Sequence, residues 1–304
     1  MEWEKLGNIF NPKIGFHPKL YTHASNPLPL HLNNNIYRIY YNGRDKQNRS
    51  SIGAIEYDII SRKLIKYFKQ PLFIHDNENS YYSDGVSIGC QYSMGGDIYM
   101  LFMGWKILDN GFWQGEIGRL KIENDGSLTY RDDGPLLSID TANSISLSYP
   151  FVAKNSNGKY KMWYGSTITR DAGNGEMLHV ISNATSTDGI KWIPNGLAIP
   201  FEIGVAQAFS KPCIIKNKYG LEMWYSYRGN SDEKYCIGYA KSLDGEDWEI
   251  DNSKAGINVS DLGWDSEMVC YPYVFNHKGN WYMLYNGNGF GKTGFGLAVL
   301  KNDS

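Results

Sequence analysis

The sequence lacks the features of several large protein classes. No apolar run in its 304 residues approaches the length of about 18 that a membrane span requires. Residues 1–5 are not a basic start leading into an apolar stretch, so we expect no secretory signal peptide. With 30 Lys and Arg against 32 Asp and Glu, the formal net charge is −2. This balance argues against nucleic acid or an anionic membrane as a partner.

Cysteine is scarce, and its spacing gives no site. The four cysteines stand far apart in the sequence, and no Cys/His spacing of a metal site is present: Cys90, Cys213, Cys236 and Cys270. In a chain without an export signal we expect free thiols and a cytoplasmic location. The sequence requires no metal and no cofactor.

Aromatic residues and glycine are abundant, and they repeat at a fixed interval. The chain has 12 Phe, 9 Trp, 23 Tyr and 33 Gly. Five strand-like runs end in an aromatic residue, one further residue and then a small residue. The small residues stand at a constant step of 61: Gly43, Gly104, Gly165, Ser226 and Gly287. This periodicity across the whole chain indicates a repeat fold.

The repeat unit reads as about four strands. Asp-Gly pairs, which favour hairpin turns, occur at Asp125-Gly126, Asp188-Gly189 and Asp244-Gly245. An aromatic residue follows shortly after each pair. We therefore predict an all-β, five-bladed β-propeller formed by residues 1–304 as a single domain. The last repeat stops after its third strand, so residues 3–10 are predicted to add the closing strand. A β-sandwich, or two smaller β domains, is the alternative.

Titratable residues stand at equivalent positions of three repeats. Twenty residues before the small residue lie His23, Asp84 and Glu267, whereas the other two repeats have Ile145 and Ala206. Blades one, two and five would be neighbours in a closed ring, so the two acids would flank the histidine. Paired carboxylates cleave glycosidic bonds, and a wide gap between them favours inversion. We predict Glu267 as general acid and Asp84 as general base, with local structural roles as the alternative.

Further residues are predicted to hold a sugar near the same level. Arginines at strand ends can bind a carboxylate or phosphate in a fork, and tyrosines before the inner-strand prolines offer aromatic faces. An ion pair or a place in the core is the alternative for each. The predicted substrate-binding residues are His23, Arg44, Asp45, Tyr149, Lys211, Arg228, Asp265, Tyr271 and Asn288.

Two segments resemble a known superfamily. They are Ile237-Gly238-Tyr239-Ala240-Lys241-Ser242-Leu243-Asp244-Gly245-Glu246-Asp247-Trp248 and, less specifically, Met162-Trp163-Tyr164. With the inner strands, they look like the five-bladed propellers of glycoside hydrolase families 43, 62, 32, 68 and 130. The segment 264–274 looks like predicted glycosidases often found with bacterial surface-polysaccharide genes. The resemblance implies catalytic acids at the channel mouth, here Asp84 and Glu267, although His23 stands where families 43 and 32 carry a catalytic Asp.

Three functions follow as hypotheses, each with a saccharide as the partner. The first is a glycosidase with an inverting acid/base mechanism. The second is a transferase or phosphorylase that uses a phosphorylated or activated sugar, for which Arg44, Lys211 and Arg228 would supply the positive charge. The third is a propeller that binds carbohydrate without catalysis.

Overall fold

The structure is a computed structural model that describes residues 1–12, 16–76, 80–140, 145–155 and 157–301. Its regular structure is almost entirely β, with twenty strands in these residues. Three short helical segments accompany them: η1 (Pro18–Leu20), η2 (Asn252–Ala255) and the single turn α1 (Asn288–Gly291). We find no helix in the described ranges that is long and apolar enough to cross a membrane.

Three of the sheets have four strands each, and all neighbouring strands in them are antiparallel. One contains β10 (Ser146–Lys154), β11 (Tyr160–Thr169), β12 (Leu178–Ser186) and β13 (Ile193–Leu197). The next contains β14 (Ser210–Asn217), β15 (Gly220–Tyr227), β16 (Cys236–Ser242) and β17 (Glu249–Ile250). The third contains β18 (Cys270–His277), β19 (Asn280–Asn286), β20 (Phe295–Leu300) and β1 (Trp3–Phe10).

The remaining strands form two groups of four. The first group is β2 (Thr22–Asn33), β3 (Ile36–Arg44), β4 (Ser50–Asp58) and β5 (Lys63–Tyr67). The second is β6 (Gly85–Met94), β7 (Asp97–Ile107), β8 (Trp113–Ile122) and β9 (Leu128–Thr129). A parallel pair, Ser50 with Gly85, joins the two groups into one eight-stranded sheet.

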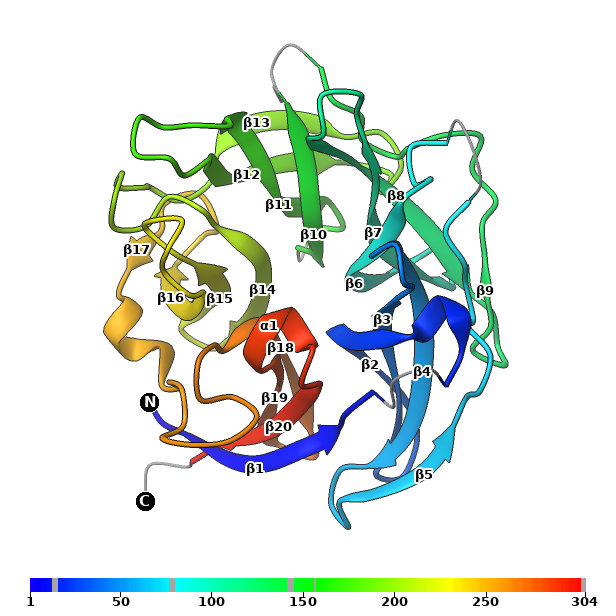
Figure 1. Cartoon of the computed structure of the whole chain (residues 1–304). Coiled ribbons are helices and arrows are strands. Elements are labelled where there is room, and N and C mark those ends of the chain that lie inside the picture. Colours follow the sequence, from blue (N-terminus) through cyan, green and yellow to red (C-terminus); the bar gives the residue numbers. More distant parts are fainter. Residues whose placement is uncertain (13–15, 77–79, 141–144, 156, 302–304) are drawn as a thin grey trace.

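The sheets surround a common centre (Figure 1). The first strand of each group, β2, β6, β10, β14 or β18, lies nearest the centre, and the outermost strands include β5, β13 and β17. The strand β1 lies along β20 with Trp3 opposite Leu300, so residues from both ends of the described chain share one sheet. The predicted all-β, propeller-like architecture is therefore confirmed at this level.

The predicted Asp-Gly turns link the third and fourth strands of three groups. In the β12–β13 turn, the Asp188 carboxylate accepts hydrogen bonds from the backbone N–H groups of Ile190 and Lys191. Gly189 follows with a φ of 76°, a conformation that glycine adopts at little cost. The β16–β17 turn repeats this arrangement around Asp244 and Gly245. The short acceptor and the glycine explain why this dipeptide recurs.

Every inner strand contains a bulge at the same place. The register with the second strand shifts between Ser25 and Leu28, and equivalent shifts follow in the other groups after Ile88, Ser148, Ser210 and Cys270. Four of these bulges contain a non-glycine residue with positive φ: Asn26, Tyr149, Lys211 and Tyr271. Such a backbone is uncommon for tyrosine and lysine, though less so for asparagine, and it turns the side chain out of the regular alternation of a strand.

Candidate binding cavity at the centre of the ring

The bulges surround a cavity of about 300 Å³. Serines that immediately precede or open the bulges contribute to its wall: Ser25, Ser87, Ser148 and Ser210. Aromatic side chains form much of the rest: Trp105, Trp113, Tyr149, Phe209, Tyr235, Tyr271 and Phe290. Apolar faces together with convergent hydroxyl and amide groups are typical of a small-molecule site.

Two tyrosines from different groups of strands meet in the cavity wall. The bulges of β10 and β18 carry Tyr149 and Tyr271, whose rings lie 5.3 Å apart with a hydroxyl–hydroxyl distance of 3.3 Å. Burial raises the pKa of both phenols, so both keep their protons at neutral pH. The pair therefore offers the cavity an aromatic face and a neutral O–H donor.

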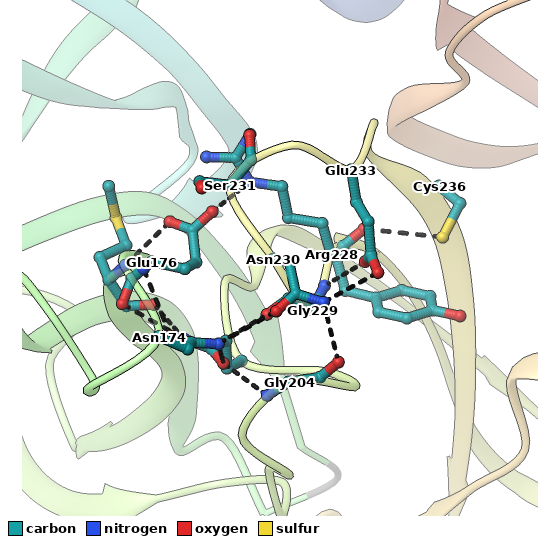
Figure 2. Close-up of polar contacts among 12 residues, drawn as sticks. Asn174, Glu176, Gly204, Arg228, Gly229, Asn230, Ser231, Glu233 and Cys236 are labelled. Atoms are coloured by element: carbon teal, nitrogen blue, oxygen red, sulfur yellow. Dashed lines mark hydrogen bonds and ion pairs between the residues drawn. The ribbon is translucent and has the colours of Figure 1, made fainter.

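Arg228 lies in the wall and is held from behind. Its Nε is 2.6 Å from Oε2 of Glu176, a carboxylate with only 2% exposure of its side chain. On its other side, the guanidinium carbon lies 5.0 Å from the centre of the Tyr235 ring. Figure 2 shows Glu176 reaching Arg228 from the loop that connects β11 and β12. The ion pair and the ring fix the arginine while leaving 20% of its side chain exposed.

Buried amides hold the loop that carries Glu176. The Gln207 side chain, which is fully buried, donates to the backbone oxygens of Glu176 and Met177 and to the Asn174 side chain. Asn174 in turn donates to the side chain of Gln207. It also donates to the side chain of Asn230 (Figure 2). This network links the loops on either side of Arg228 and limits its possible positions.

Arg44 also lines the cavity, but nothing comparable holds it. Among the described residues no carboxylate lies within 4.0 Å of its guanidinium. The neighbouring Asp45 is buried and occupied elsewhere, because it pairs with the Arg49 Nε at 2.9 Å and accepts the backbone N–H groups of Gln47 and Arg49. The prediction that Asp45 binds substrate is therefore not supported by its contacts, which stabilise the turn after β3.

His179 and Ser148 form a buried hydrogen-bonded pair beside the cavity. Nε2 of His179 lies 2.7 Å from the Ser148 hydroxyl, and its Nδ1 lies 2.7 Å from the Thr167 hydroxyl. Burial lowers the pKa of His179 to about 4, so the ring is neutral at neutral pH. A Cβ at Gly165 would lie 2.2 Å from the serine oxygen and 2.3 Å from Nε2. The repeated small residue therefore makes room for this pair.

The two predicted catalytic acids lie elsewhere. Asp84 precedes β6, and its carboxylate accepts the backbone N–H of Ile107 at 2.8 Å. Glu267 is exposed and lines an outer hollow with His23, Asn288 and Lys292. That hollow shares no lining residue with the central cavity, and Asp84 lines neither of the two. The structure therefore does not bring the two acids together in the cavity.

Other predicted residues have local roles. His23 has its pKa lowered to about 4 by burial and, next, by the charge of Arg44, and its Nδ1 lies 2.8 Å from the Thr22 hydroxyl. The amide oxygen of Asn288 accepts the backbone N–H groups of Glu267 and Met268. Asp265 is buried, with its Oδ2 2.7 Å from the Lys5 Nζ and 3.0 Å from the Tyr285 hydroxyl. These bonds explain why Asp265 does not face the cavity.

Lys211 departs furthest from its prediction. Its amine is buried in the centre of the ring and donates to the backbone oxygens of Ile88, at 2.6 Å, and Gly89. Burial lowers its pKa to about 7. Because the bulge of β14 directs this side chain toward β6 rather than into the cavity, Lys211 links two non-adjacent groups of strands. Lys211 is not among the residues that line the cavity.

Nothing in the described ranges suggests a metal centre, since no three of their His, Cys, Asp or Glu side chains cluster as ligands. All four cysteines are free thiols, and three of them are buried.

Comparison with known proteins identifies relatives along the whole chain. No family model matches. Two uncharacterized proteins of Mycobacterium tuberculosis, MT1551 and Rv1502, are each 36% identical over 304 residues, with 99% of this chain and 100% of the relative covered. The chain belongs to the family of MT1551 and Rv1502.

Solved structures show the fold of this family. A glycosyl hydrolase from Bacteroides ovatus superposes with a TM-score of 0.75 at 16% identity, covering 99% of this chain and 94% of the other. A thermostable family-43 glycoside hydrolase gives 0.69 at 16% identity, covering 96% and 93%. A structure from work on the GH130 family of mannoside phosphorylases gives 0.73 at 15% identity, covering 99% and 94%. The resemblance carried by residues 162–164 and 237–248 is confirmed as a likeness of fold to solved structures described as glycoside hydrolases.

Several residues in the cavity wall or directly behind it are not predicted by the repeat. Glu176 and Asn174 come from a loop and carry no repeat signal, whereas Gln207 directly follows Ala206, which stands 20 residues before Ser226. His179 stands on β12, the third strand of its group, whereas the predicted catalytic positions precede or begin first strands. One signal was available for Ser148, because Ser25, Ser87, Ser148 and Ser210 recur at steps of 61 or 62 residues.

Proposed function

We propose that the chain is a carbohydrate-active enzyme that binds its saccharide in the central cavity. In this proposal residues 1–304 form one five-bladed propeller domain, and β1 closes the ring by completing the last blade. The pairing of β1 with β20 supports the closure, and the repeated bulge in five inner strands supports the count. The unpaired cysteines favour a reducing compartment such as the cytoplasm.

The observation that carries the proposal is the composition of the cavity wall. A sugar ring presents an apolar face and a set of hydroxyls, and here Trp105, Trp113 and the Tyr149–Tyr271 pair stand beside serine and asparagine side chains. Such a combination suits a sugar better than it suits a purely apolar ligand. Relatives in fold that are described as glycoside hydrolases add support.

Hydrolysis by an acid pair is the first candidate reaction. It needs one protonated and one ionised carboxyl group across the scissile bond. Asp84 and Glu267 remain the predicted pair, although neither lines the cavity. Hydrolysis through them would therefore require the saccharide to reach beyond the cavity into the outer hollow that Glu267 lines.

A transferase or phosphorylase reaction that uses a phosphorylated or activated sugar is the second candidate. It is favoured by the charges in the described wall, which includes Arg44 and Arg228 but no Asp or Glu. The fold likeness to the structure from work on mannoside phosphorylases is consistent with it. In this reaction the neutral Tyr149–Tyr271 pair would donate a hydrogen bond to an oxygen of the bound sugar.

A substrate screen tests the proposal. Purified protein is incubated with aryl glycosides, oligosaccharides and sugar 1-phosphates, with and without inorganic phosphate, and products are followed by chromatography. We expect turnover of at least one compound, with Trp105→Ala and Tyr149→Phe slowing it at least tenfold. Trp192→Phe, a substitution outside the cavity wall, is the matched control and should leave the rate within twofold.

Two results would contradict the proposal. Saccharide binding without any turnover would leave a non-catalytic carbohydrate-binding propeller. Turnover that is indifferent to Trp105 and Tyr149 but abolished by Glu267→Gln would place the reaction in the outer hollow instead.

A further inference from the structure

The charges in the cavity wall are unbalanced. Arg44 and Arg228 are its charged residues at neutral pH, because the described lining includes no carboxylate and His179 is neutral. Glu176 lies behind the wall and compensates Arg228. Arg44 has no such counterion within 4.0 Å in the described part of the chain. The cavity therefore carries a net positive charge.

The positive potential extends past Arg44. The charges of Arg44 and Lys292 both lower the pKa of His23, which lines the outer hollow. Arg44 also lowers the pKa of Tyr149 on the cavity side, although burial outweighs it. The charge of Arg44 thus acts on groups in both the outer hollow and the cavity. Asp45 does not neutralise it, because Arg49 and two backbone N–H groups already occupy that carboxylate.

A half-buried guanidinium without a counterion, such as that of Arg44, is electrostatically unfavourable unless an anion binds to it. Removing charge from water costs free energy unless an opposite charge or hydrogen-bond acceptors replace the solvent. Arginine presents a planar fork that matches phosphate and carboxylate oxygens. The rigid mounting of Arg228 by Glu176 and Tyr235 adds a pre-positioned second donor, for which little entropy is lost on binding.

We propose that the saccharide in the cavity binds together with an oxyanion, a phosphoryl or carboxylate group, that is held by Arg44 and Arg228. This inference rests on the proposed function and specifies its substrate class. The aromatic faces of Trp105 and Tyr149 would contact the sugar ring, while the guanidinium groups would contact the oxyanion. A neutral saccharide leaves the charge of Arg44 uncompensated and binds more weakly.

Calorimetry and thermal unfolding test the inference with defined probes. The probes are glucose, mannose and galactose, their 1-phosphates, glucuronate, inorganic phosphate, and inorganic phosphate with each neutral sugar. We expect at least one anionic probe to bind at least tenfold more tightly than its neutral counterpart. Tighter binding of a sugar 1-phosphate than of phosphate with free sugar would identify a covalently carried phosphoryl group; the reverse would identify free phosphate.

Three arginine variants locate the binding. Arg44→Met should weaken binding of the anionic probe at least tenfold and should fold normally, because Arg44 holds no ion pair. Arg228→Lys, which keeps the charge but loses the fork, should weaken it by a smaller factor. Arg62→Met removes an exposed arginine and should change the affinity by less than twofold. Circular dichroism of each unliganded variant confirms its fold.

The outcomes separate this inference from the proposed function. Equal binding of neutral and anionic saccharides, unaffected by Arg44→Met, overturns the oxyanion site and leaves the saccharide site standing. Binding of phosphate that depends on Arg44 but gains nothing from any sugar supports the oxyanion site and contradicts the proposed function. Anion binding that is the same in wild type and Arg44→Met places the anion elsewhere and overturns the inference.

Discussion

The central cavity and the outer hollow differ in how their charged and titratable groups are held. In the cavity region Glu176 is buried, paired with Arg228 and supported by Gln207. In the hollow Glu267 is exposed, and no ion pair within 4.0 Å is formed by its carboxylate among the described residues. Glu176, which is buried and paired, thus lies in a loop behind the cavity wall. Glu267, which the repeat predicted as catalytic, is exposed in the outer hollow. Position in a repeat indicates height around a ring, but burial and pairing decide which group the fold depends on.

The largest expected effect is a loss of stability in acid from two histidines: His23 in the hollow and, more deeply buried, His179 at the cavity. The pKa of His179 is about 4 in the folded protein and about 6.5 in the unfolded chain. Between these values the unfolded chain binds a proton that the folded protein does not, so the free energy of unfolding falls as the pH falls from 6.5 to 4. The full loss is about 3 kcal/mol. Urea denaturation of wild type and His179→Gln between pH 7 and pH 4.5 measures it.

His179→Gln should make this part of the pH profile less steep, and His23 should account for part of the slope that remains. An unchanged profile would mean that the Ser148–His179–Thr167 contacts do not exclude a proton from the ring.

A second test breaks the cavity region directly. Gly165→Ala places a Cβ 2.2 Å from the Ser148 hydroxyl, so the Ser148–His179 pair must shift. We expect the free energy of unfolding to fall by about 2.5 kcal/mol. Gly134→Ala is the matched control, because a Cβ there meets nothing within 4 Å. Chemical denaturation should show the control within about 0.5 kcal/mol of wild type, and equal losses in both variants would refute the close packing at Gly165.

The third test compares the two glutamates. Glu176→Gln removes the counterion of Arg228 and should lower the free energy of unfolding by about 2 kcal/mol, less than for a fully buried pair because Arg228 retains some solvent contact. Glu267→Gln should change it by less than about 0.5 kcal/mol. Thermal unfolding of both variants at pH 7 provides the measurement. A larger loss for Glu267→Gln would reverse our view of which acid the fold requires.

The repeat made the fold predictable, and the bulges limited the prediction of the site. A step of 61 residues and the Asp-Gly turns were sufficient to expect four-stranded units around a centre, because strand length and turn chemistry are local properties. Counting back 20 residues, however, reached Asp84 and Glu267, which precede β6 and β18. The cavity wall instead begins at the bulges, near Ser25 and Ser148. An inserted residue reverses the alternation of side chains, so the facing of these positions could not be read from strand periodicity.

Among the predicted binding residues at strand ends and bulges, some line the cavity and others do not, because their neighbours differ. Arg44, Tyr149, Arg228 and Tyr271 line the cavity. Lys211 occupies the same bulge position as Tyr149, but its amine bonds to backbone oxygens of β6. Pairing across the ring depends on residues more than a hundred positions away, and no local pattern in the sequence reports it.

The shared sheet of β1 and β18–β20 has a consequence for how the protein folds. β1 ends at Phe10, whereas β18 begins only at Cys270. During folding Trp3 and Phe10, which are buried in the native structure, therefore lack their native cover until these distant segments meet. Contacts of such high sequence separation form slowly, so we expect completion of this sheet to be a late step of folding.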